Sequence, residues 1–211
     1  MLPIYIGFGV VMVLIFAGFG VNRWVQTRRL VAAYATPTPG PNASQKPIQL
    51  TIGEMLGKKV FPRGERPTGG LGQPVDGIKC GSGMYVYLHI HTHLALYDNG
   101  VQIRIPRYLG MAPTPTGGCL YWIHTHDASG VIHVEAPKLG KYVLGDFFAI
   151  WGEPLSRTNI GGFKGPVTAY VNGALYTGKL SKIPLLAHQQ IVLEVGKPII
   201  PPPNYAFPPG E

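Results

Sequence analysis

Two short runs of the sequence collect nearly all of the histidines. The run LHIHTHL at 88–94 has histidine at every second position, and the run HTHDASGVIHVE at 124–135 carries three more. Together they hold six of the seven histidines of the 211-residue chain: His89, His91, His93, His124, His126 and His133. Side chains alternate along a strand, so residues at every second position share one face. Because imidazole is a common ligand of copper, zinc and iron, the pattern predicts a transition-metal site on a sheet.

Glu135 extends this predicted ligand set, because it shares a strand face with His133. Asp127 is predicted to support the site from behind, by fixing the tautomer of a ligating imidazole. The copper, zinc or iron ligands would then come from the six histidines and Glu135. Two alternatives stay open: a hydrogen-bonded network of histidines with neighbouring tyrosines and no metal, and a pH-sensing surface. His188 stands alone and is predicted to be structural.

The two cysteines precede the two histidine runs. Cys80 lies nine residues before His89, and Cys119 lies five residues before His124. This placement predicts a disulfide that clamps the two histidine strands, closing a loop of about 40 residues worth about 3–4 kcal/mol. The alternative is that both thiolates ligate copper or zinc.

The regular elements that would position these residues are mostly strands. The stretch YVYLHIHTHLALY at 85–97 alternates between apolar and polar residues, which is typical of a half-buried strand. Asn-Gly pairs at 99–100 and 172–173 predict tight hairpins. CLYWIHTH at 119–126 and HQQIVLEVG at 188–196 are predicted as further strands.

One short helix is predicted within residues 142–154. Leu144, Phe147, Phe148 and Trp151 form an apolar stripe at helical spacing, and Gly152 ends it. The predicted fold class is therefore mainly β, an antiparallel sheet or small β-sandwich with one short helix, preceded by a single N-terminal transmembrane helix.

The two ends of the chain differ in composition from its middle. No charged side chain precedes Arg23, and roughly 20 apolar residues suffice to span a bilayer. We expect a transmembrane anchor at 1–24, a basic flank and Pro-rich linker at 25–46, a β-rich, His-rich domain at 47–197 and a Pro-rich tail at 198–211. The tail is expected to be free or to lie extended along a partner.

Charge and cysteine usage bear on partners and location. Four of the 18 basic residues precede residue 47 and all ten acidic residues follow it, which leaves the domain at +4, too mild for nucleic-acid binding. Arginines after the apolar run favour a cytoplasmic domain. The cysteine pair and the Pro-rich spacer favour the opposite side. We expect the periplasmic (exoplasmic) side of the cytoplasmic membrane.

Four stretches resemble a family of membrane-anchored or secreted prokaryotic proteins that is itself uncharacterised. They are HIHTHLALYDNG, CLYWIHTHDASGVIHVEAP, LGDFFAIWG and IPLLAHQQIVLEVG, within residues 77–197. The resemblance implies an exoplasmic β-rich domain and supports the cysteine pair as a family feature, but it implies no reaction. This chain departs from the family pattern in having no basic residues before the apolar run.

Common enzyme signatures are absent from the sequence: it has no phosphate-binding glycine loop, no GxSxG elbow, no HExxH helix and no CxxC pair. The predicted function is non-enzymatic, a membrane-anchored metal-binding or scaffold domain that stabilises a respiratory or photosynthetic membrane complex as an accessory subunit. The alternative is a metal-dependent hydrolase or oxidase that uses Glu135 or Asp127 as its base.

Overall fold

The computed structural model describes residues 21–28, 31–32, 34–44, 46–114 and 117–211. The chain separates into two compact units, Met1–Ala35 and Thr36–Glu211. In the first unit, residues 21–28 are helical. The predicted anchor falls almost entirely outside the described residues, and within the described part of the chain no helix has the length and apolar character of a membrane span.

The second unit is mainly β, as predicted. Its strands are β1 (Ile48–Gln49), β2 (Cys80–Gly81), β3 (Leu88–Asp98), β4 (Val101–Ile103), β5 (Met111–Thr114), β6 (Gly117–Tyr121), β7 (Ile123–His124), β8 (Val131–Ala136), β9 (Asn159–Ile160), β10 (Phe163–Lys164), β11 (Val167–Val171), β12 (Ala174–Leu175), β13 (Gln189–Val195) and β14 (Tyr205–Ala206). Its helical elements are α2 (Leu144–Trp151) and the 3₁₀ turn η1 (Leu180–Lys182).

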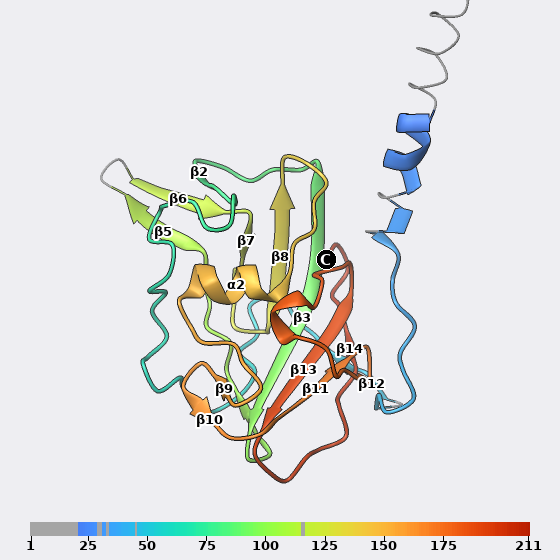
Figure 1. Ribbon diagram of the computed structural model, residues 1–211, viewed down its shortest axis with the longest axis vertical. Helices are drawn as coiled ribbons and strands as arrows, with labels where there is room; N and C mark the ends of the chain where they lie inside the picture. Colours follow the sequence, from blue (N-terminus) through green and yellow to red (C-terminus); the bar gives the residue numbers. More distant parts are fainter. Residues whose placement is uncertain (1–20, 29–30, 33, 45, 115–116) are drawn as a thin grey trace, which may run out of the picture. The chain divides into compact units, whose positions relative to one another are not determined.

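The largest sheet is organised around β3, its longest strand (Figure 1). The strand order is β12-β11-β13-β3-β8-β7, and β4 also pairs with β3. One edge of β3 pairs with β8 and then β4, both antiparallel, while the other edge pairs with β13 in parallel. The predicted antiparallel sheet is therefore mixed. Parallel neighbours need a long crossover connection, and the stretch between Asp98 and Gln189 supplies it.

Both predicted Asn-Gly hairpins are present. Asn99 and Gly100 have φ values of 51° and 75°, and Asn172 and Gly173 have values of 52° and 76°. Positive φ at both central residues is the type I′ geometry, whose twist matches that of the flanking strands. The first turn joins β3 to β4 and the second joins β11 to β12.

The predicted helix is confirmed as α2. Asp146 accepts a hydrogen bond from the backbone N–H of Val143 at 2.9 Å, which satisfies a donor at the helix start. Gly152 ends the helix in the left-handed conformation with φ 84°. The predicted apolar stripe is buried.

The expectation that β3 is half-buried is wrong. Its residues from Ile90 to Asp98 are buried on both faces. The face that carries the histidines continues into Ala95 and Tyr97, and an apolar cluster covers it there. The buried members of that cluster are Leu50, Ala95, Tyr97, Val131, Val192 and Tyr205. Segments outside the strand thus cover the face that local alternation assigns to solvent.

Tyr205 comes from the Pro-rich tail, which was expected to be free or to follow a partner. Instead, the tail packs on its own domain: β14 pairs in parallel with β1, and Tyr205 is only 4% exposed. A buried aromatic ring supplies the apolar area that keeps such a segment in place.

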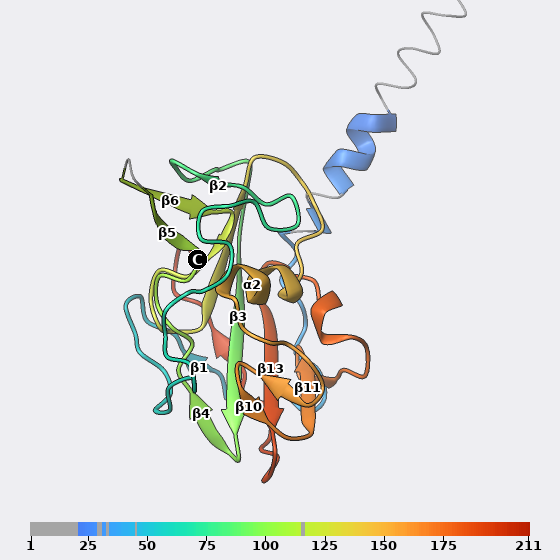
Figure 2. The same ribbon diagram turned by 60° about the vertical axis from the view of Figure 1, so that its left-hand side comes forward.

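The predicted disulfide between Cys80 and Cys119 is present, with Cα atoms 5.2 Å apart. It does not clamp the histidine strands. The stretch CLYWIHTH is divided at Trp122 between β6 and β7, and these strands belong to different sheets. The bond joins β2 to β6 in the small sheet β2-β6-β5, which lies apart from β11 and β13 (Figure 2). Thiolate ligation of a metal is thereby excluded for the bonded pair.

Candidate metal centre

The sheet register places most of the predicted ligands side by side. Strand β8 lies between β3 and β7. His133 on β8 is opposite His91 on one side and His124 on the other, and Glu135 is opposite His89. Residues directly opposite each other project from the same face, so these five side chains converge. His126 joins them from the loop after β7.

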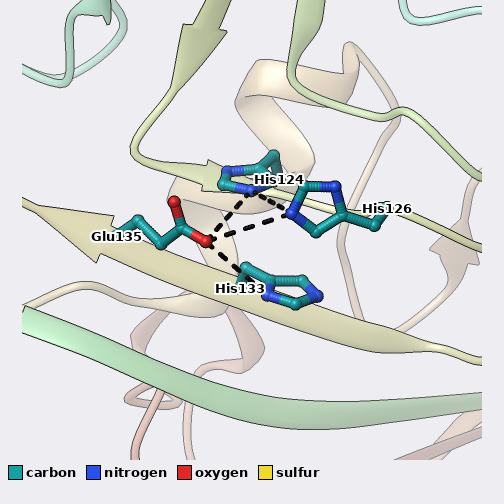
Figure 3. A group of neighbouring side chains, drawn as sticks. All are labelled: His124, His126, His133 and Glu135. Carbon is teal, nitrogen blue, oxygen red and sulfur yellow. Dashed lines mark hydrogen bonds and ion pairs between the residues drawn. The ribbon is translucent and has the colours of Figure 1, made fainter. Parts of the chain in front are cut away.

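The carboxylate of Glu135 points towards the rings of His124, His126 and His133 (Figure 3). Its Oε1 lies 3.3 Å from His89 Nε2, 3.7 Å from His124 Nε2, 4.0 Å from His126 Nε2 and 3.8 Å from His133 Nδ1. Its other oxygen, Oε2, is buried without a hydrogen-bond partner. We name His89, His91, His124, His126, His133 and Glu135 the histidine cluster.

Two overlapping groups within the histidine cluster could hold a metal ion. The first contains His124, His126, His133 and Glu135, and the second contains His89, His91 and His133. In each group the potential ligand atoms all lie within 4.8 Å of one another. The cluster is open to solvent at two points, because the side chains of His89 and His126 are 42% and 41% exposed.

Burial keeps three imidazoles of the cluster uncharged at neutral pH. It lowers the pKa of His91 and of His124 to about 4. The pKa of His133 falls to about 2, first because of burial and then because other histidines surround it. A neutral imidazole is the form that ligates a metal, so no proton has to be displaced from these three rings.

Glu135 is held in its ionised form. Burial favours the neutral carboxyl, but the nearby imidazoles of His126, His124 and His89 outweigh it, so that the pKa of Glu135 is lowered. The nearby Glu135 carboxylate is the main reason that the pKa of His126 is raised. The cluster thus combines neutral imidazoles with one buried negative charge.

The tautomer of His124 is fixed by the backbone. Its Nδ1 lies 2.9 Å from the carbonyl oxygen of Tyr121, which can only accept, so Nδ1 carries the proton. Its Nε2 then presents a lone pair to the cluster, 3.2 Å from His126 Nε2. Backbone support of this kind orients metal-ligating histidines. No local sequence pattern indicates the Tyr121 carbonyl, because a backbone acceptor can lie at any residue.

Asp127, predicted to support a ligand, holds a turn. Its Oδ1 accepts from the N–H and the hydroxyl of Ser129, at 2.9 and 2.5 Å, and its Oδ2 accepts from the N–H of Gly53 at 2.7 Å. The turn connects His126 to β8, so Asp127 positions the cluster through the backbone.

His93 lies outside both candidate groups. It is fully buried, its Nε2 donates to the carbonyl of Ser129 at 2.9 Å, and its ring centroid is 3.9 Å from that of Tyr205. Burial lowers its pKa to about 4. His93 therefore belongs to the contact between β3 and the tail.

Glu211 was not predicted, yet it lies beside the cluster. Burial and the charge of Asp127 raise its pKa, and His126 opposes the shift. His188, predicted as structural, contacts the same part of the tail: its Nε2 lies 2.9 Å from the Glu211 carbonyl, and its ring stacks on Phe207. A long-range contact of this kind leaves no local pattern in the sequence.

Comparisons with known proteins add no further constraint on the site. No protein-family model matches the chain, and neither a curated protein nor a solved structure matches it. The resemblance to an uncharacterised prokaryotic family therefore stays an expectation, and the function must be argued from the histidine cluster itself.

Proposed function

We propose that the protein binds a transition metal ion, copper, zinc or iron, through His124, His126, His133 and Glu135. The observation that carries the proposal is the convergence of three imidazoles and a buried carboxylate on one point. Three nitrogen ligands and one oxygen ligand suit these metals in a tetrahedral or more open geometry.

The distances between ligand atoms support the proposal. Metal–nitrogen bonds of about 2.1 Å place neighbouring ligands about 3.0–3.4 Å apart in octahedral and tetrahedral sites. His124 Nε2 and His126 Nε2 are separated by 3.2 Å, within this range, and Glu135 Oε1 lies 3.7 Å from His124 Nε2, slightly beyond it. Two ring nitrogens at such a distance need a shared proton or a cation between them, because facing lone pairs repel.

The test is metal analysis of the full-length protein purified without chelator. Wild type is expected to hold a transition metal, and His126→Ala to lose it from this group. His126 is partly exposed, so its truncation should leave the fold intact. His188→Asn is the matched control: it removes a histidine outside both groups, and asparagine tolerates the positive φ of 53° at that position. A metal-free wild type that takes up no added metal would favour the hydrogen-bonded network.

A second candidate function, a metal-dependent hydrolase or oxidase, is favoured by the exposure of His126 at 41%. A metal bound there would have a side open to water or substrate. Of the two predicted bases, Glu135 is better placed as a ligand, and Asp127 is engaged in its turn. Metal-dependent turnover of ester, phosphoester or redox substrates, lost in His126→Ala, would support the enzyme.

For the cellular setting we keep the proposal of an exoplasmic domain tethered to a membrane, as an accessory subunit of a larger complex. The Cys80–Cys119 disulfide supports a compartment in which thiols are oxidised. Protease access in intact spheroplasts, followed by native gels after mild detergent extraction, tests location and partner separately.

A further inference from the structure

The histidine cluster is built symmetrically around β8. On one side β3 presents the pair His89 and His91, and on the other side β7 and its following loop present the pair His124 and His126. Each pair has one residue between its members, so each is a His-x-His unit, with His89 and His91 on one face of β3 and His126 just beyond the end of β7. Each pair also combines a buried histidine with a partly exposed one, as the side chains of His89 and His126 are 42% and 41% exposed.

The two pairs share the same internal geometry. His89 Nε2 and His91 Nε2 lie 3.1 Å apart, and His124 Nε2 and His126 Nε2 lie 3.2 Å apart. Both separations equal the spacing of neighbouring ligands on a metal with bonds of about 2.1 Å. The geometry of a His-x-His unit does not require its two ring nitrogens to lie so close together. Because the short distance occurs in both pairs, the two pairs point to the same function.

Between the pairs, β8 supplies His133 and Glu135. His133 belongs to both groups that could hold a metal. Its ring centroid lies 4.6 Å from that of His91 and 4.4 Å from that of His126. Glu135 Oε1 reaches His89 Nε2 at 3.3 Å and His124 Nε2 at 3.7 Å. The carboxylate is 3% exposed, and its Oε2 is buried without a partner, as expected of a ligand with remaining capacity.

We propose that the cluster binds two transition metal ions side by side, one chelated by His89 and His91 and the other by His124 and His126. Glu135 lies between the two positions and can bridge them through its two carboxylate oxygens, and His133, whose neutral ring has one free lone pair, completes one of the two. This inference rests on the proposed function and extends it from a single site to a dinuclear one. A central carboxylate suits such an arrangement, because a negative charge between two cations reduces their mutual repulsion.

The test measures the number of ions bound per full-length chain. Protein stripped with chelator is dialysed against Zn²⁺, and bound zinc is determined by elemental analysis. Wild type is expected to bind two ions. His89→Ala and His126→Ala form a matched pair, since both residues are partly exposed and lie on opposite sides of β8. Each variant is expected to bind one ion, and the double variant none with high affinity, while His188→Asn keeps two.

A second measurement reports whether the two ions are neighbours. Wild type loaded with Cu²⁺ should give an electron paramagnetic resonance spectrum broadened by the nearby second ion, and each single variant should give the spectrum of an isolated copper. One ion per wild-type chain, still bound in His89→Ala, would overturn the dinuclear site and leave the proposed function standing. Two ions with both spectra isolated would also overturn it. No bound ion in wild type would overturn both proposals.

Discussion

His91 and His93 lie two residues apart on the same face of β3, but their surroundings differ. His91 Nε2 lies 3.1 Å from His89 Nε2, within the histidine cluster. His93 lies against Tyr205 of the tail and donates to Ser129. One strand face thus changes from a polar, partly open cluster end into a covered apolar end. The segments that fold over a face decide what its histidines can do.

The largest expected effect is on metal binding by the histidine cluster. Glu135→Gln keeps the size of the side chain but removes the negative charge at the meeting point of four imidazoles. We expect it to abolish tight metal binding, because an amide is a poor ligand beside neutral imidazoles. Elemental analysis and thermal melts of the stripped protein check this. Retention of stoichiometric metal by the variant would exclude Glu135 as a ligand.

The covered end should show the opposite behaviour. Tyr205→Ala removes a buried ring from the contact with His93 and Tyr97, and we expect it to cost about 3–5 kcal/mol of unfolding free energy. Metal stoichiometry under native conditions should stay unchanged. Urea titration with the disulfide intact measures the first quantity and equilibrium dialysis the second. A variant that loses metal while losing little stability would show that the tail serves the cluster directly.

Acid should destabilise the metal-free protein. The folded pKa of His93 is about 4, below its unfolded value of 6.5, so as the pH falls the unfolded chain takes up the proton first. Stability is therefore fully present above pH 6.5 and declines towards pH 4. At pH 4.5 the lowered pKa of His93 accounts for a loss of about 2–3 kcal/mol of unfolding free energy. Urea titrations with chelator at pH 7 and pH 4.5 test this, and in His93→Gln that share of the decline should be missing.

The smallest effect is expected at the turn between the two ends. Asp127→Asn keeps an acceptor for Ser129 but replaces the oxygen that receives the Gly53 N–H, which should cost about 1 kcal/mol. Because Asp127 acts through the turn, metal stoichiometry should be retained with a modest loss of affinity. Abolished binding in this variant would instead make Asp127 part of the metal site itself.

Much of the fold was readable from local pattern. The Asn-Gly turns, the apolar stripe of α2 and the strand at 189–195 are each dictated by a few neighbouring residues. The errors of the prediction all lie where distant segments meet. The parallel pairing of β3 with β13, the break at Trp122 and the place of the disulfide depend on which strand becomes a neighbour, and alternation within one strand carries no such information.

The candidate site likewise depends partly on local pattern and partly on contacts between distant segments. Alternation within each run predicted that His89 and His91 share one strand face and that His133 and Glu135 share another. No local pattern indicated that β8 lies between β3 and β7, that Glu135 is buried among four imidazoles, or that Tyr205 covers His93. Periodicity fixes only the direction of a side chain relative to its own strand. Strand order and the burial of apolar segments fix what that side chain meets.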